Sequence, residues 1–323
     1  MKYAVGVDLG GTSIKAALVE HGVGLVHQTA VPTDAEKGPE AVLDRIEEVV
    51  RAMEAVCPDG CAAGVGIGVP GSVNWERTTL IRPANLPGWG VIDVRATLQH
   101  RLGRDLPVVV ENDASAAALG SAHYGVGKPF DSFIMITLGT GVGGAIIYKN
   151  TIFRGTSGAA GEIGHMSIDY DGPASRQGVP GAVEAYIGQR FLSHHARYRL
   201  LGRPHSRIHE IGGPDLEDLT PKLLHTAAVE GDENAQGMLA WAGHKLGAVL
   251  GSVINLLDIR KVVVGGGVSA ADDMILDPAR EAIRVYTMPT VREGVEIVRE
   301  TRGNEVGMLG AAHLVFELLD DSA

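Results

Sequence analysis

Short apolar runs that end in glycine alternate along the chain with longer segments of helical periodicity. Three runs within residues 2–32 are short, rich in apolar residues and separated by Gly22 and Gly24, which predicts an antiparallel meander. Residues 38–56 predict an amphipathic helix on one face of a sheet, because apolar side chains recur at helical spacing between charged ones: Val42, Leu43, Ile46, Val49, Val50, Met53 and Val56.

The same order of elements returns in the second part of the chain. Residues 62–71 and 106–113 predict buried strands, and a helix follows the second of them. From residue 131 a strand, a glycine-rich turn and another strand echo the beginning, with Gly139 in the place of Gly10. A long helix near 233–258, a strand near 261–269 and a closing helix near 306–319 complete the pattern. The sequence therefore predicts two copies of one βββαβα plan, with a boundary around 125–131.

Length and composition agree with a two-domain α/β protein. The chain has 323 residues, of which 45% are hydrophobic, and 44 glycines are typical of closely packed layers. The net charge of −11, with no long basic run, argues against nucleic acid as a partner. Neither a signal segment nor a membrane-length apolar run is present, so we expect a cytoplasmic protein without membrane attachment. Cys57 and Cys61 are the only cysteines and are interpreted as reduced thiols beside a turn.

Glycine-rich turns follow three of the predicted strands, beginning near Gly10, Gly139 and Gly265. One such turn is common, because glycine reaches positive φ without strain. Three of them at the ends of apolar strands indicate a site where backbone amides bind phosphates and a nucleotide.

The stretch from Gly161 to Tyr186 contains Glu162, His165 and Glu184 in a polar, glycine-rich segment. These side chains are compatible with a metal site, an acid–base site, a set of hydroxyl-binding groups or a solvated loop. A zinc-protease helix would carry a second histidine four residues from the first, and that histidine is absent.

Five segments in this order resemble the ROK family of sugar kinases and repressors, within the hexokinase–actin–Hsp70 superfamily. They read DLGGTSIKAAL, ENDASAAALG, LGTGVGGAII, GAAGEIGH and VVVGGGVS, and the resemblance covers nearly the whole chain. It implies an α/β protein of two ribonuclease-H-like, actin-like ATPase domains with a central cleft that closes over ATP and a sugar. The first domain would span residues 1–125, with the C-terminal helix able to pack back on it, and the second residues 126–323.

The resemblance also implies a nucleotide site. Backbone amides in the first two turns would contact phosphate oxygens, since glycines let them approach closely. Asp8 would hold Mg²⁺ through a water molecule. Mg²⁺ prefers oxygen ligands and keeps part of its hydration shell. Lys15 is either a further phosphate contact or a solvent-facing strand residue. The complete implied set is Asp8, Gly10, Gly11, Thr12, Lys15, Gly139, Thr140 and Gly141, with Gly265, Gly266 and Gly267 beside the adenosine.

For the sugar, the resemblance implies that Asp113 accepts the proton of the attacking hydroxyl, since an alcohol is a poor nucleophile. The alternative for Asp113 is an N-cap of the following helix, and both roles are compatible. Hydroxyl recognition is implied for Asn85, Asn112, Asp113, Glu162, His165 and Glu184. Carboxylates accept hydrogen bonds from paired hydroxyls, and asparagine both donates and accepts. The segment 161–186 is then a hydroxyl-binding segment.

The function that follows is an ATP- and Mg²⁺-dependent sugar kinase, with glucose phosphorylated at C6 as the first expectation. N-acetylmannosamine, N-acetylglucosamine, fructose, allose and a cyclitol remain alternatives, as does a sugar-binding regulator without turnover. A repressor is not expected, because the first motif starts at Asp8 and leaves no room for a DNA-binding domain. ATP is preferred over polyphosphate, since no extra basic run is present. The resemblance implies a homodimer or a higher homo-oligomer.

One departure from the family pattern concerns zinc. Typical members carry three cysteines after the signature histidine, and these close a tetrahedral zinc site with it. Here Ser175, Gln177 and Ala182 stand in their places, while Gly178, Gly181 and Glu184 fit the pattern. A hydroxyl, an amide or a methyl group does not replace a thiolate on zinc. The sequence therefore predicts a zinc-free protein whose His165 is available to hydrogen-bond a sugar or a neighbouring carboxylate.

Overall fold

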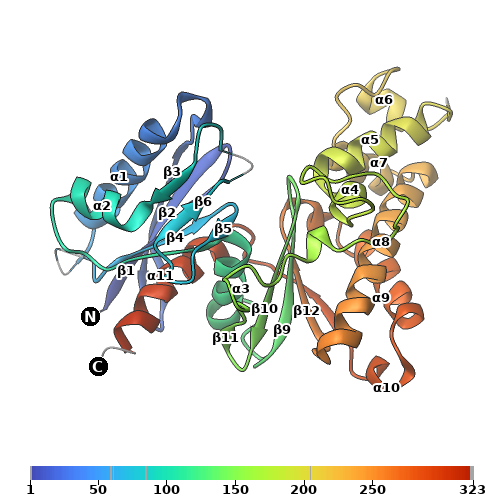
Figure 1. The fold of residues 1–323 in the computed structure, drawn as a ribbon. Coiled ribbons are helices and arrows are strands. Elements are labelled where there is room, and N and C mark those ends of the chain that lie inside the picture. The colour runs from blue at the N-terminus through green and yellow to red at the C-terminus, as the bar shows by residue number, and fades with distance from the viewer. Residues whose placement is uncertain (1, 59, 61, 84–85, 204, 321–323) are drawn as a thin grey trace. The chain divides into compact units, whose positions relative to one another are not determined.

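The structure is a computed structural model that describes residues 2–58, 60, 62–83, 86–203 and 205–320 (Figure 1). The chain divides into two compact units. Unit 1 comprises residues 1–132, 145–161 and 301–323, and unit 2 comprises residues 133–144 and 162–300. Cys61 and Asn85 lie outside the described residues, and Cys57 is buried.

The first sheet has the strand order β3-β2-β1-β4-β8. Strands β1 (Tyr3–Leu9), β2 (Ser13–Glu20) and β3 (Gly24–Pro32) are antiparallel neighbours, which confirms the predicted meander. Strands β4 (Val65–Val69) and β8 (Val108–Asn112) continue the sheet in parallel to β1. The carboxyl ends of β1, β4 and β8 therefore lie along one edge, where α/β sheets present ligand-binding groups.

Helix α1 (Pro39–Ala55) covers one face of this sheet together with α2 (Val94–Leu102). Its buried side chains are those expected from the periodicity, except that Val56 follows the last helical residue and is 45% exposed. Short strands form a separate sheet: β5 (Ser72–Val73), β6 (Thr79–Ile81) and β7 (Val91–Asp93).

Helices α3 (Asp113–Tyr124) and α11 (Glu305–Asp320) pack against each other, and α11 also covers the other face of the first sheet. The sheet presents small residues to α11, including Ala4, Ala17 and two glycines. A Cβ atom on Gly6 would lie 1.9 Å from the carbonyl oxygen of Met308, and one on Gly66 would lie 1.7 Å from that of Ala311. No side chain fits in these places, so α11 rests directly on the backbone of the sheet.

The second sheet has the order β11-β10-β9-β12-β13, the same arrangement as the first. An antiparallel hairpin, β10 (Val142–Tyr148) and β11 (Thr151–Ile152), is followed in the sheet by β9 (Phe133–Leu138). Strands β12 (Lys261–Gly265) and β13 (Glu296–Arg299) continue in parallel with β9. The matching orders confirm the prediction that one structural plan occurs twice.

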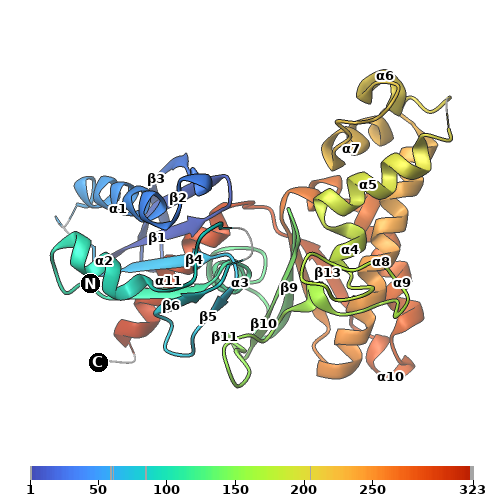
Figure 2. The same ribbon diagram turned by 45° about the horizontal axis from the view of Figure 1, so that its top comes forward.

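The helices of unit 2 are dominated by α8 (Glu233–Leu257) and α9 (Asp273–Tyr286), which run side by side in both views (Figure 1, Figure 2). The remaining helical segments are α4 (Glu184–Ile187), α5 (Gln189–Leu200), α6 (Ile208–Gly212), α7 (Pro221–Val229), α10 (Pro289–Arg292) and the 3-10 turns η2 (Ile163–His165) and η3 (Gly267–Ala271). Within the described part of the chain, no helix combines the length and apolar character that a membrane span requires.

We predict that Gly66→Ala lowers the free energy of unfolding by about 2 kcal/mol or more, because the new methyl group would force α11 away from β4. Gly90→Ala is the matched control. Its Cβ would meet no atom within 4 Å, so we expect a change below about 0.5 kcal/mol. Urea unfolding of both variants measures the difference, and equal stabilities would contradict the close packing of α11.

Candidate functional site

The turn between β1 and β2 leaves two backbone amides unpaired. The amide of Gly10 donates to the carbonyl of Ser13 at 3.1 Å, and the Thr33 hydroxyl donates to the carbonyl of Gly10 at 2.6 Å. Among the described residues, the amides of Gly11 and Thr12 have no acceptor. A Cβ on Gly11 would meet no atom within 4 Å. The amides of Gly11 and Thr12 thus remain available for an anion. The Gly10 amide, which was also expected to contact phosphate, instead closes the turn by donating to Ser13.

The turn between β9 and β10 repeats this arrangement in unit 2. The amide of Gly139 donates to the carbonyl of Gly141 at 3.0 Å. The amides of Thr140 and Gly141 have no acceptor in the described part of the chain. Gly10 and Gly139, which the sequence places in equivalent positions, therefore have equivalent roles in closing their turns. Each unit offers two open amides to a phosphate-like group.

Glu184 supports the second turn. It is buried, and its Oε2 accepts a hydrogen bond from the amide of Val142 at 3.1 Å. A Cβ on Gly141 would lie 2.2 Å from the same oxygen, so glycine is required there. Glu184 is therefore engaged with the backbone of its own unit, a contact that the motif alone did not predict. Its hydroxyl-binding role remains a prediction.

Asp8, near the carboxyl end of β1, is partly buried. Burial raises the pKa of its carboxyl group, and the positive charge of Lys15 lowers it in part. Lys15 Nζ lies 3.8 Å from Asp8 Oδ2, on the paired residue of β2. Gly307, without a side chain, lies beside the carboxylate: a Cβ there would be 3.4 Å from Asp8 Cγ. An oxygen donor whose charge is incompletely balanced fits a hard cation such as Mg²⁺.

The turn after β12 lies against the second phosphate-type turn within unit 2. Gly266 has φ 86° and a Cβ there would be 2.4 Å from the carbonyl of Leu138, the last residue of β9. The Ser269 hydroxyl donates to the carbonyl of Gly266 at 2.6 Å. Gly265 is packed beside Met135, whereas a Cβ on Gly267 would meet nothing within 4 Å. Gly265 and Gly266 thus pack closely against β9, and Gly267 leaves the backbone open beside them.

Asn112 and Asp113 stand where β8 ends and α3 begins. Asn112 is the N-cap of α3: its Oδ1 accepts from the amides of Ala114 and Ser115, and its Nδ2 donates to the carbonyl of Gly71. Asp113 is the first helical residue; it is exposed and its Oδ1 accepts from Ala114 at 2.8 Å. The N-cap considered for Asp113 therefore belongs to Asn112, a correction that leaves the Asp113 carboxylate at the surface of unit 1.

The buried carboxylate of Glu111, next to Asn112 in the chain, forms an ion pair with the partly buried Arg154, and the sequence patterns gave neither residue a role. Arg154 Nε and Nη2 lie 2.9 and 2.8 Å from Glu111 Oε2. Glu111 Oε1 accepts the amide of Asn112 at 3.0 Å. The pair joins the end of β8 to the segment after β11. The only sequence signal was a charged residue within a strand expected to be buried.

In the signature segment, Glu162 comes just before a 3-10 turn of unit 2 and His165 ends that turn. Glu162 precedes η2 and is exposed, and His165 is its last residue. His165 Nε2 lies 3.9 Å from Glu162 Oε2, which is too long for a hydrogen bond. His165 Nδ1 is buried with no partner in the described part of the chain. Neither ring nitrogen of His165 is therefore hydrogen-bonded among the described residues, and both could bond to a ligand.

The loop that lacks the family's cysteines is held by hydrogen bonds. Ser175 donates its amide to Val179, Gly181 donates to Pro173, and Ile168 donates to the carbonyl of Gly181. The Tyr186 hydroxyl donates to Asp169 at 3.1 Å, and burial, followed by the Asp169 contact, raises the pKa of Tyr186 to about 12. Backbone hydrogen bonds and the Tyr186–Asp169 contact therefore hold this loop.

The fold and turns together define a class of protein. Two five-stranded sheets with one strand order, each with a glycine turn that has two amides without an acceptor among the described residues, are typical of the two-domain actin-like ATPases. Residues 4–317 match the model of the ROK family, and the chain belongs to that family.

Relatives extend over nearly the full chain. It is 34% identical over 324 residues to a glucokinase of Streptomyces coelicolor, with 98% of each covered. It is 31% identical to a glucokinase of Halalkalibacterium halodurans, covering 97% of this chain and 95% of that protein. The crystal structure of a ROK family glucokinase from Streptomyces griseus in complex with glucose and AMPPNP matches with a TM-score of 0.86 at 32% identity, covering 98% and 99% of the two chains.

We predict that Arg154→Met destabilises the protein by about 3–5 kcal/mol, because it leaves the buried Glu111 carboxylate without its counter-charge. The double variant Glu111→Gln/Arg154→Met should recover most of this loss, since no buried charge remains. Arg45→Met is the control, because it removes only exposed ion pairs with Glu48 and Asp34 and should leave stability nearly unchanged. Chemical denaturation measures all three, and additive losses in the double variant would contradict the pairing.

Proposed function

We propose that the chain is an ATP-dependent sugar kinase that transfers the γ-phosphate of ATP to a hexose, with glucose and its C6 hydroxyl as the first choice. Support comes from the glucokinases among its relatives and from the family membership of residues 4–317. The observation that carries the proposal is the pair of glycine turns with open amides, combined with the exposed carboxylate of Asp113.

Asp113 is proposed to accept the proton of the sugar hydroxyl. As the first residue of α3 it has the exposure that a substrate contact needs, and the adjacent Asn112 cap holds the helix start in place. A carboxylate within about 3 Å of the hydroxyl orients it and takes its proton as the phosphoryl group leaves ATP. Much of the rate would come from alignment and from the amides that receive the phosphate charge.

Asp8 is proposed to hold Mg²⁺ through water. When bound, Mg²⁺ would neutralise part of the negative charge on the phosphates of ATP. The chain's own contribution is a partly buried carboxylate whose cationic neighbour, Lys15, lies 3.8 Å away, at the long end of ion-pair distances. The amides of Gly11, Thr12, Thr140 and Gly141 would bind phosphate oxygens, and Gly267 would lie beside the nucleoside.

Sugar recognition is proposed for Glu162, His165, Glu184, Asn112 and Asn85. His165 has a buried ring nitrogen without a partner among the described residues, which favours a ligand hydroxyl as its partner. Glu184 and Asn112 already bind backbone groups, so they would use their remaining oxygen or N–H for the sugar. A sugar that lacks a matching hydroxyl would leave these groups unpaired, which gives selectivity.

The kinase proposal is tested by ADP release from ATP and Mg²⁺ with glucose, fructose, allose, N-acetylmannosamine, N-acetylglucosamine and a cyclitol. We expect turnover with at least one hexose, with the highest kcat/KM for glucose. Binding of ATP and sugars without ADP release would instead support a regulator. Polyphosphate in place of ATP, with the same sugars, identifies the phosphoryl donor.

Asp113→Asn should lower kcat by at least about 10²-fold, because an amide does not accept the hydroxyl proton. Its folding stability should be nearly unchanged, because Asn112 supplies the helix cap. Asn112→Ala is the matched variant for stability and should lose about 1 kcal/mol through loss of that cap. An Asp113→Asn enzyme with near-normal turnover would restrict Asp113 to the first turn of α3.

A further inference from the structure

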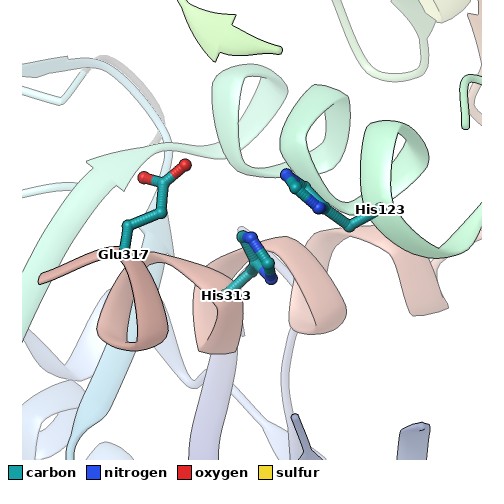
Figure 3. Close-up of side chains that lie close together, drawn as sticks. All are labelled: His123, His313 and Glu317. Carbon is teal, nitrogen blue, oxygen red and sulfur yellow. The ribbon is translucent and has the colours of Figure 1, made fainter. Parts of the chain in front are cut away.

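Three metal-ligating side chains converge in unit 1, and none of them belongs to the glycine turns or to the signature segment. They are His123 in the last turn of α3, and His313 and Glu317 on α11 (Figure 3). One ligand atom from each, a ring nitrogen or a carboxylate oxygen, lies within 4.8 Å of the other two. His313 and Glu317 are four residues apart on one helix and so project from the same face.

The close packing of α3 and α11 makes this convergence possible. A Cβ on Gly120 would lie 1.9 Å from the carbonyl of Val306, and one on Gly310 would lie 1.7 Å from that of Ala116. The two helix backbones therefore approach within contact distance near the cluster. The imidazole rings of His123 and His313 stack, with centroids 3.6 Å apart.

The hydrogen bonds of the two histidines leave nitrogen atoms available. His123 Nε2 is buried and has no partner among the described residues. The hydroxyl of Tyr124 lies 3.2 Å from His313 Nδ1, which leaves Nε2 of that ring as a ligand. A metal-bound histidine commonly uses its second nitrogen in such a contact, which fixes the tautomer and the ring orientation.

The charge state also suits a metal. Burial, and then the neighbouring histidines, lower the pKa of His313 to about 3, and burial lowers the pKa of His123. A neutral imidazole is the form that binds a metal, and these shifts favour the neutral form. Glu317 adds one negative charge, although it also acts electrostatically on Arg77.

From this geometry we propose that His123, His313 and Glu317 bind one divalent transition-metal ion, with Zn²⁺ as the best match, and so clamp the end of α3 to α11. Two nitrogens and one carboxylate oxygen are a set that zinc accepts, with water in the fourth position. Ligand atoms around zinc lie about 3.4 Å apart for bonds of about 2.1 Å, so the side chains would move on the order of 1 Å, and the stacked rings of His123 and His313 would tilt apart so that both nitrogens point at the ion. This proposal departs from the sequence-based expectation of a zinc-free protein, which rested on the cysteines missing from the signature loop and on the distance of Cys57 and Cys61 from that loop in the sequence.

The test uses the full chain, prepared without a metal-affinity tag and dialysed against a chelator. Zn²⁺ is titrated by calorimetry, and Co²⁺ is followed by its visible absorption. We expect one ion per chain with a Kd in the micromolar range or tighter, and a rise in the thermal unfolding midpoint with Zn²⁺.

His123→Ala and Glu317→Gln should each weaken binding at least 10-fold, and Tyr124→Phe should weaken it by about 10-fold. Glu317→Gln is close in shape to the native residue, so circular dichroism should show a folded protein. His244→Ala, at an exposed histidine on α8, and His165→Ala, on the signature loop, are the controls and should bind as the native chain does. Absence of one-to-one binding, binding unchanged in His123→Ala and Glu317→Gln, or loss of binding in His165→Ala would overturn the proposal.

Discussion

Helix α11 lies directly on the backbone of the first sheet, and this contact determines where Asp8 and Asp113 are held in unit 1. Gly6 and Gly66 let α11 lie on β1 and β4, and Gly120 with Gly310 lets α3 lie on α11. Because interiors are packed nearly as densely as crystals, an added methyl group at these places has no free volume to enter. The ends of β1 and β8, and the start of α3, are therefore fixed relative to one helix. Asp8 and Asp113 depend on this helix although neither motif contains any of its residues.

The two glycine turns of the duplicated plan share one backbone arrangement, which suits anion binding. In both turns the first glycine closes the turn with its own amide, and the next two amides remain open. The two turns differ in what supports them: Thr33 contacts the first, whereas the Glu184 carboxylate holds the second through Val142. Gly266 then adds a close contact with Leu138 at the end of β9. Glu184, which the resemblance assigns to sugar recognition, thus also supports the turn whose amides would bind a phosphate of ATP.

Sequence patterns predicted the strands, long helices, repeated plan and glycine turns because these depend on local periodicity and on glycine conformations. They did not predict the Glu111–Arg154 pair, whose members are separated by 43 positions, or the His123–His313 stack, whose members belong to helices at distant places in the chain. The Asn112 cap was also missed, because Asn and Asp are equally good caps and only the backbone angles decide between adjacent candidates. Side-chain pairing across the fold is a tertiary property that a single sequence does not encode locally.

The two acidic residues at neighbouring strand ends show how burial separates structural from functional charges. Glu111 is almost fully buried, and Arg154 contacts one of its oxygens through two nitrogens while an amide contacts the other. Such a carboxylate has its charge and hydrogen bonds satisfied, so it stabilises the local structure without binding anything further. Asp8 is also partly buried, but its nearest cationic partner is 3.8 Å away and burial raises the pKa of its carboxyl group. Desolvation without full compensation makes this carboxylate less stable as an anion, and an incoming cation would remove that deficit. The difference between the two sites lies in their partners rather than in residue type, and it is visible only once the strands are assembled.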